Sequence, residues 1–485
     1  MNLQPLLEPQ WMNAILPEIV LASSGMILIL IDAFWPKVRG FLAPLTVIAL
    51  IGTLMAEMQI EGGSFFGRTY EISAITQLFD FAFILAALLV TMLSREYLER
   101  ERIEGGEYYA LILWGTIGMM MMAKGLDLLV VILGLEMLSI CIFALVGYHR
   151  RLPISNEASL KYFLMGAFAT GFILYGTAFF YGAAGSTRID DLASYLATAA
   201  SPSPLVTIGF VLLMGGIGFK LALAPFHGWA PDVYQGAPTP VAAWLSVAPK
   251  AATLIALIRI VAALFPSREI ISSTTIVMIL SIASMILGNF VAIAQRDLKR
   301  MLAYSGIAHV GYMMIAMMVM RDEAVAAITV YAIVYAFMNI GAFGVVSLLD
   351  KNQNDPQTLN DVAGLGFRKP FYGMALALFM FSLAGLPPTA GFVAKFYVFK
   401  VAIEGGATGV AIVGILTSIV SVYYYLRVVY YLYMKEADAT TPASATGIFS
   451  VGALAISCIG VLVIGLYPTP LFRTALHAAR TLLQN

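Results

Sequence analysis

Residues 211–250 read VLLMGGIGFKLALAPFHGWAPDVYQGAPTPVAAWLSVAPK, a stretch in which polar and helix-breaking residues interrupt apolar sequence. Two lysines, Lys220 and Lys250, lie inside apolar runs, and four prolines occur from Pro225 to Pro240. Proline removes a backbone hydrogen bond from a helix, so we expect the helix to break here. At membrane depth, irregular backbone occurs only where protein or water satisfies its polar groups. The stretch therefore indicates a polar cavity or pathway inside a membrane protein.

The composition of the whole chain is that of an integral membrane protein. Of its 485 residues, 60% are hydrophobic and 12% are charged, and the mean hydropathy is +0.87; soluble globular proteins lie far from these values. A membrane-spanning helix needs about 20 mainly apolar residues. Counting such runs predicts an all-α protein with about 14 transmembrane helices, near residues 13–35, 39–57, 75–94, 108–123, 126–147, 159–182, 205–228, 238–262, 272–295, 300–320, 323–349, 370–400, 407–433 and 446–468.

Charge balance and cysteine content exclude several classes of function. The chain has 28 basic and 28 acidic residues, so we expect no nucleic-acid partner. Its two cysteines, Cys141 and Cys458, cannot form the four-cysteine ligand set of an iron–sulfur cluster. The four histidines show no metal-binding spacing. We therefore expect no metal and no cofactor on this chain.

Basic residues are distributed unevenly between the expected loops. Loops after odd-numbered spans hold 14 lysines and arginines, including Lys351, whereas the opposite loops and the termini hold seven, including Lys124 and Arg268. Because basic residues favour the cytoplasmic side, we expect both termini on the outer side. The first apolar run lacks a basic n-region and a cleavage site, so we interpret it as a retained span.

Charged residues in the middle of expected spans are candidates for an ion pathway. Glu136 is the single charge halfway along the fifth span, Lys220 lies well inside the seventh, and Lys250 is about three turns into the eighth. A buried ammonium group loses and regains its proton readily when its surroundings change. We predict that these residues belong to a proton relay; the alternative is that they only hold helices together as ion pairs.

Three further polar residues allow two interpretations each. Lys161 opens the sixth span, where it belongs either to the pathway or to an i,i+4 pair with Glu157. His227 follows Lys220 by seven residues, so a continuous helix would place both on one face, roughly 10 Å apart. That spacing suits a water-bridged relay, although His227 could equally cap carbonyl groups at a helix end. His309, in the tenth span, is a candidate relay residue with the same ambiguity.

Two interrupted spans resemble each other. FKLALAP at 219–225 and FSLAGLP at 381–387 match at four of seven positions, and they lie five expected spans apart. An odd number of spans reverses the direction of a helix, which is the signature of an inverted repeat. Lys395 follows the second interruption within its span and is a further pathway candidate.

These observations predict four parts of the chain. Apart from Asp80, the first three spans carry little unusual chemistry, so we assign them a peripheral position. The predicted parts are residues 1–107, an N-terminal three-helix peripheral segment; 108–262, a first five-helix repeat; 263–433, a second, inverted five-helix repeat; and 434–485, a C-terminal helix with an amphipathic surface segment.

Six segments closely resemble subunit N of the proton-translocating NADH-quinone oxidoreductase, respiratory complex I. They are LGLEMLSICIFALVGY (133–148), KYFLMGAFATGFILYG (161–176), GFKLALAPFHGWAPDVYQGAPTPV (218–241), SVAPKAA (246–252), AYSGIAHVGY (303–312) and SLAGLPPTAGFVAKFYV (382–398). The most diagnostic segment is APFHGWAPDVYQGAPTPV. The sibling subunits L and M and the Mrp-type antiporters share its PFH and PTP elements but differ in the sequence that lies between these two elements.

The resemblance implies an antiporter-like fold with discontinuous helices 7 and 12. It implies a proton-translocating membrane subunit, coupled to quinone reduction elsewhere in the complex. The positions that match the family's charged residues are Glu136, Lys161, Lys220, Lys250 and Lys395. NADH, FMN, iron–sulfur clusters and quinone are then expected on the rest of the complex. Expected partners are lipids and the other membrane-arm subunits, including M, K and J, in a bacterial inner membrane or, alternatively, a thylakoid membrane.

Other functions stay open from the sequence alone. One is a sodium/proton antiporter of the Mrp type, and a second is a redox enzyme that binds quinone itself. A third is a scaffold whose buried charges only set helix packing. A fourth is a plastid or cyanobacterial relative that works with ferredoxin and plastoquinone.

Overall fold

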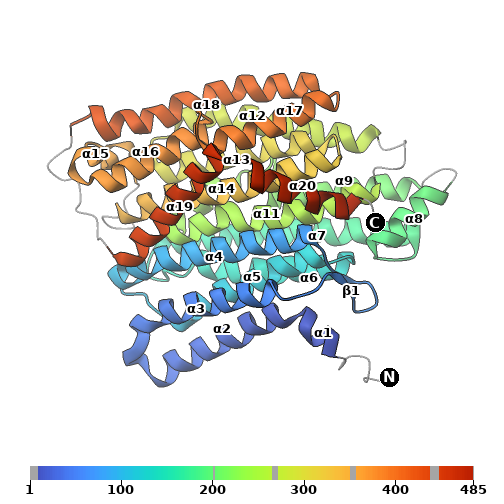
Figure 1. The fold of residues 1–485 in the computed structure, drawn as a ribbon, viewed down its shortest axis with the longest axis horizontal. Helices are drawn as coiled ribbons and strands as arrows, with labels where there is room; N and C mark the ends of the chain where they lie inside the picture. The colour runs from blue at the N-terminus through green and yellow to red at the C-terminus, as the bar shows by residue number, and fades with distance from the viewer. Residues whose placement is uncertain (1–8, 200–202, 265–270, 350–356, 437–446, 484–485) are drawn as a thin grey trace.

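The computed structural model describes residues 9–199, 203–264, 271–349, 357–436 and 447–483. Arg268 and Lys351, which entered the orientation argument, lie outside these ranges. Long helices run roughly parallel to one another through the molecule, from α2 at one edge to α18 at the other (Figure 1). The described part of the chain is thus a layered bundle of helices, as the apolar runs predict.

Every expected span coincides with a helix or a pair of helices. The corresponding elements are α2 (Leu16–Phe34), α3 (Leu42–Glu57), α4 (Ala74–Glu101), α5 (Gly106–Lys124), α6 (Leu128–Val146), α7 (Pro153–Ala184), α9 (Pro204–Lys220), α11 (Thr239–Leu264), α12 (Ile271–Ala294), α13 (Leu298–Met317), α14 (Asp322–Leu348), α16 (Pro370–Ala384) with α17 (Ala390–Glu404), α18 (Thr408–Met434) and α19 (Ile448–Leu466). Within the described residues, ten helices are long and apolar enough to cross a membrane, and α9 and α16 are shorter apolar helices. The chain is therefore a multi-pass membrane protein.

Shorter elements connect and cover the long helices. They are α1 (Pro9–Ala14), η2 (Pro36–Phe41), β1 (Gly63–Phe65), β2 (Tyr70–Ile72), α8 (Ile189–Thr198), α10 (Trp229–Gly236), η3 (Leu359–Val362), α15 (Leu365–Arg368) and α20 (Thr469–Leu483). The two strands form an antiparallel hairpin in which Ser64 pairs with Glu71.

Helices α11 and α14 form the centre of the bundle. The apolar segment of α11 is 100% buried and that of α14 is 94% buried, against 28% for α2. They pack against each other, and α4 packs against both. A helix that is apolar all round belongs in a protein interior, and here the central α11 carries Lys250 into it.

Helices α2 and α3 lie at one edge of the bundle, where α2 packs on α5 and α3 packs on α4 (Figure 1). The sequence argument placed Lys124 in a loop, and that placement is wrong. Lys124 is the last residue of α5 and is fully buried. Its side chain points into the space between the N-terminal helices, where acidic residues surround it.

The C-terminal segment forms the amphipathic helix that the sequence predicts. Helix α20 packs across α14 and α4 through the buried alanines Ala475, Ala478 and Ala479. Arg480 on α20 lies 3.8 Å from Asp322 at the start of α14. In Figure 1, α1 and the end of α20 lie toward the same end of the bundle.

Candidate functional site

The first helix break begins at Lys220. Helix α9 ends at this residue, turns occupy most of residues 221–228, and α10 begins at Trp229. Ala222 adopts a φ of +56°, which a right-handed helix cannot contain. The indole of Trp229 donates a hydrogen bond of 2.9 Å to the Phe219 carbonyl. The predicted interruption is confirmed, but it starts before Pro225.

This early end of α9 changes the interpretation of His227. The proposed face shared with Lys220 assumed a continuous helix across seven residues, and that assumption is wrong because the helix stops at Lys220. His227 lies in the turn, partly exposed, with its ring 6.4 Å from that of Tyr304. The structure therefore does not align His227 behind Lys220.

Lys220 and Glu136 each form a hydrogen bond with a neutral hydroxyl group. The Lys220 Nζ donates to Ser139 Oγ at 2.7 Å, and Ser139 lies about one turn along α6 from Glu136. Glu136 Oε1 accepts a hydrogen bond of 2.6 Å from Thr170 Oγ1 on α7. Lys220 thus forms its hydrogen bond with Ser139 and not with the carboxylate of Glu136.

Lys250 is buried in the middle of α11. It is 2% exposed, and its Nζ has no hydrogen-bond partner among the described residues. The ammonium lies 5.8 Å from the ring centroid of Tyr234. Gly306 on α13 permits this close approach, since a Cβ there would be 3.0 Å from the Lys250 Nζ. A charged ammonium without a hydrogen-bond partner is costly to bury.

His309 lies on α13, three residues beyond Gly306, and tyrosines surround it. Its Nδ1 is 2.8 Å from the hydroxyl of Tyr331, and its Nε2 is 3.0 Å from the hydroxyl of Tyr425. The Tyr425 hydroxyl is in turn 2.5 Å from Ser305 Oγ. The imidazole is 1% exposed and forms part of a continuous hydrogen-bonded group near Lys250.

Lys395 closes the second helix break. Its Nζ donates to the carbonyl groups of Leu383 and Ala384, at 2.9 and 3.1 Å, and to Ser418 Oγ at 2.9 Å. These carbonyl groups are the last of α16, so the ammonium lies at the negative end of that helix. The break predicted from Pro387 and its neighbours is confirmed. The end of α16 leaves these carbonyl groups without helical partners, and Lys395 donates hydrogen bonds to them.

A cavity of about 460 Å³ leads from the surface of the bundle to Lys395. Gly385, Phe392, Phe396 and Ser418 also line it. Since Phe396 is 52% exposed, the cavity opens where a lipid or another subunit would contact the chain.

Substitution of Gly391, the second residue of α17, tests how tightly the second helix break is packed. A Cβ built on Gly391 would overlap the carbonyl oxygen of Ser382. We expect Gly391→Ala to destabilise the chain by about 1–3 kcal/mol or more, because backbone atoms would have to move. The measurement is the amount of chain in membranes and its thermal stability. Gly409→Ala is the matched control, since Gly409 is the second residue of α18 and a Cβ there meets nothing within 4 Å. Equal stability of the two variants would contradict this packing.

Lys161 lies at the surface of this chain, unlike the other lysines of the predicted pathway. Its side chain is 46% exposed, and its Nζ is 2.7 Å from Glu157 Oε1 and 3.3 Å from Asp232 Oδ2. Asp232 also accepts a hydrogen bond of 2.7 Å from Arg300. The i,i+4 pair with Glu157, one of the two interpretations, is therefore present.

We expect Lys161→Ala to have a smaller effect than changes at the buried lysines. Exposed ion pairs contribute about 0–1 kcal/mol, so the chain should assemble normally. Proton pumping by the assembled complex should fall by less than about fivefold, because 1 kcal/mol corresponds to about that factor. A loss as large as that of a buried-lysine variant would show that a neighbouring subunit buries Lys161.

The sequence argument did not identify the neutral partners of these charges. Ser139, Thr170, Ser418 and Tyr425 contact the candidate residues, but single hydroxyl residues are common in apolar helices. The signal that could have found Ser139 is its position one turn from Glu136 on the same helix. No such local signal connects Tyr425 to His309, because 116 residues separate them.

The fold and the buried lysines define a class of protein, the antiporter-like membrane subunits. Residues 125–421 match the family described as "NADH:quinone oxidoreductase/Mrp antiporter, TM". Among curated relatives, NADH-quinone oxidoreductase subunit N of Trichlorobacter lovleyi is 41% identical over 99% of this chain and 99% of its own. Subunit N of Chloroflexus aggregans is 39% identical over 96% of each chain. The chain belongs to the family of NADH-quinone oxidoreductase subunit N.

Solved structures agree with this assignment. A chain of respiratory complex I from Thermus thermophilus is 32% identical, with a TM-score of 0.80, and the match covers 94% of this chain and 98% of that one. A chain of the Mrp complex from Dietzia sp. DQ12-45-1b has a TM-score of 0.81 at 19% identity, covering 100% of this chain and 98% of that one. The likeness to the chain of the Mrp complex is one of fold alone.

Proposed function

We propose that this chain translocates protons as a membrane subunit of NADH-quinone oxidoreductase, through Glu136, Lys220, Lys250 and Lys395. The observation that carries the proposal is the Lys250 ammonium, which is buried at the centre of the bundle without a hydrogen-bond partner among the described residues. A purely structural lysine would be paired, because an unpartnered buried charge destabilises the fold. A lysine that carries protons must instead be able to release its own.

The residues on either side of Lys250 suit the two ends of such a pathway. On one side Lys220 is hydrogen-bonded to Ser139, near Glu136, so a change at Glu136 alters how strongly the Lys220 proton is held. On the other side Lys395 lies at the carbonyl end of α16, where the helix dipole favours a positive charge. His309 and its tyrosines lie between Lys250 and this second half, and we include His309 as a relay.

Lys161 and His227 have more peripheral places in the proposed pathway. Lys161 contacts Asp232 at the surface and would join the pathway only where a neighbouring subunit covers it. His227, in the turn after α9, can exchange protons with water, since it is partly exposed.

The finer architecture is part of the same proposal. We infer about 14 transmembrane helices, with inverted five-helix repeats over 108–262 and 263–433. The similar breaks after α9 and α16 support this arrangement. Both termini would face the outer side of a bacterial inner membrane, in keeping with the basic residues of the opposite loops. The neighbours would include subunits M, K and J, and NADH, FMN, iron–sulfur clusters and quinone would bind elsewhere in the complex.

Purification from native membranes tests this function. The chain should emerge in an assembly with flavin and iron–sulfur subunits, and that assembly should pump protons when NADH reduces quinone in proteoliposomes. If the chain instead emerges alone and exchanges sodium for protons after reconstitution, the proposal is wrong and the Mrp-type function is correct.

A further inference from the structure

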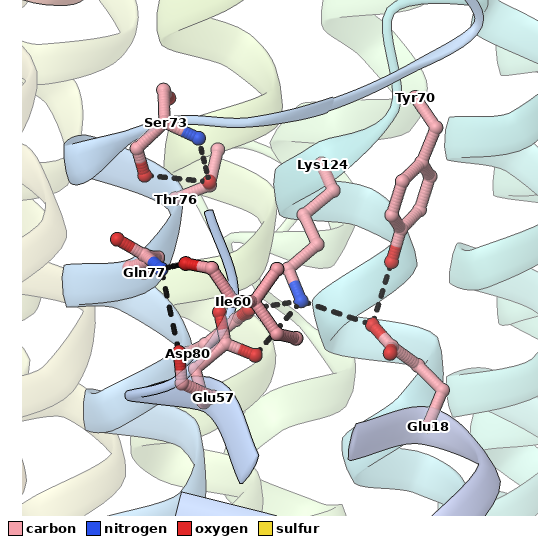
Figure 2. A network of polar contacts seen from close by, with 9 residues as sticks. All are labelled: Glu18, Glu57, Ile60, Tyr70, Ser73, Thr76, Gln77, Asp80 and Lys124. Carbon is pink, nitrogen blue, oxygen red and sulfur yellow. Dashed lines mark hydrogen bonds and ion pairs between the residues drawn. The ribbon is translucent and has the colours of Figure 1, made fainter. Parts of the chain in front are cut away.

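A second group of buried charges surrounds Lys124, at the end of the bundle where α2 and α4 begin and α3 and α5 end. The Lys124 Nζ lies 3.1 Å from Glu18 Oε1, 3.0 Å from Glu57 Oε2 and 2.7 Å from Asp80 Oδ2. Figure 2 shows the ammonium between Glu18 on one side and Glu57 and Asp80 on the other. We call these four residues the Lys124 cluster. None of them belongs to the proposed pathway of Glu136, Lys220, Lys250 and Lys395.

The hairpin of β1 and β2 covers this cluster. Tyr70 on β2 donates a hydrogen bond of 2.6 Å to Glu18 Oε1. Its backbone also forms an antiparallel β-bridge with Gly125, the residue directly after Lys124. Gln77 on α4 donates to the Ile60 carbonyl at 3.1 Å and so holds the end of α3 against α4 (Figure 2). These contacts enclose the cluster, which therefore does not lie on an open surface.

The charges of the cluster do not balance. Lys124 and Asp80 are 0% exposed, Glu57 is 3% exposed and Glu18 is 8% exposed. With every group ionised, three carboxylates would face one ammonium, which leaves two uncompensated negative charges. Buried uncompensated charge is strongly unfavourable, and carboxyl groups avoid it by binding protons.

Individual atoms lead to the same conclusion. Glu18 Oε2, Glu57 Oε1 and Asp80 Oδ1 receive no hydrogen bond from a donor group of the described residues. A buried carboxylate oxygen that accepts no hydrogen bond is costly in its ionised form, so these oxygens favour bound protons on the carboxyl groups.

A cavity lies on the other face of the strand that covers the cluster. Side chains alternate along a strand, so Tyr70 faces the cluster while Glu71 faces away from it. Glu71 Oε2 lies 3.1 Å from Arg259 Nη1, and both residues line a cavity of about 740 Å³ together with Arg68 and Arg188. Arg259 is on α11, nine residues and roughly 14 Å beyond Lys250. The cavity therefore reaches the central helix at Arg259, and strand β2 lies between the cavity and the cluster.

We propose that the Lys124 cluster is a second proton-binding site, whose carboxyl groups hold protons that exchange with the cavity at Glu71 and Arg259 as the complex turns over. The existence of the bound protons follows from the cluster itself, and only their exchange during turnover rests on the proposed function. The three carboxyl groups of the site lie in the N-terminal helices, outside both expected repeats, whereas Lys124 ends the first helix of the first expected repeat. It gives those helices a chemical role beyond their position at the edge of the bundle.

The test uses the assembled complex and infrared difference spectra between its oxidised and reduced states, recorded in H₂O and in D₂O. A protonated carboxyl group gives a carbonyl band that shifts in D₂O. We expect such a band in the native complex and its loss in Glu57→Gln and in Asp80→Asn. The ratio of protons pumped to electrons transferred should fall in the same variants. Glu18→Gln provides a third variant in case either of the others fails to assemble.

Glu96→Gln is the matched control, because Glu96 lies at the other end of α4 and accepts hydrogen bonds from Ser450 and from the Phe449 amide. It should leave the band and the pumping ratio unchanged. If the band and ratio survive in the assembled cluster variants, or if the native complex gives no such band, the cluster only pins helices and the proposal is wrong. If the band is present but pumping survives Lys220→Ala, the Lys220 pathway fails while the bound protons stand.

Discussion

Replacing Lys220 with alanine is expected to abolish proton transfer through this chain while leaving the complex assembled. Lys220 is the residue at which α9 ends, and its ammonium donates a hydrogen bond to Ser139, about one turn of α6 from Glu136. Removing a group that transfers protons directly slows such a step about 100-fold or more. In proteoliposomes, the ratio of protons pumped to electrons transferred should drop, and tightly coupled quinone reduction should slow with it.

Lys400→Ala is the control for Lys220→Ala. Lys400 is on α17, its side chain is 49% exposed, and it lies 3.8 Å from Glu404. Its loss should alter neither pumping nor assembly, because exposed pairs of this kind contribute little. If Lys220→Ala pumped protons and reduced quinone at normal rates, the pathway through α9 would be disproved.

The position of Lys220 shows what the sequence can predict. A lysine and a proline inside one apolar run both conflict with a simple span, so the break and a buried charge were predictable from local sequence. The second break is predictable on the same grounds, and Lys395 with it. The register of the first break was not predictable, because the left-handed residue is Ala222 and alanine carries no signal for that conformation. His227 was therefore placed on a helical face that does not exist.

The Lys124 cluster shows why other features stayed hidden. Glu18, Glu57 and Lys124 lie near the ends of their helices, where a charged residue normally reaches water. Only the packing of four helices beneath the hairpin removes that water, and helix contacts over such distances in sequence leave no local pattern. Asp80 was the one signal, because it is a lone charge within an apolar run.

Lys250→Met should separate stability from function more sharply than any other substitution. Methionine is apolar, unbranched and close to lysine in shape, so it can fill the same buried space on α11. Removing an unpartnered buried ammonium removes a desolvation cost, and replacing buried charge with apolar groups is often neutral or stabilising. We therefore expect unchanged or raised thermal stability of the complex, together with loss of proton pumping through this chain.

Lys250→Arg distinguishes a proton carrier from a fixed charge at the same position. Arginine keeps the positive charge but does not release its proton in proteins. If Lys250 transfers protons, Lys250→Arg should pump as poorly as Lys250→Met, measured as protons per electron in proteoliposomes. If its charge alone matters, Lys250→Arg should retain pumping while Lys250→Met loses it. Retained pumping in both assembled variants would remove Lys250 from the pathway, and with it the connection between the Lys220 and Lys395 halves, because no other buried lysine of the described chain lies on α11.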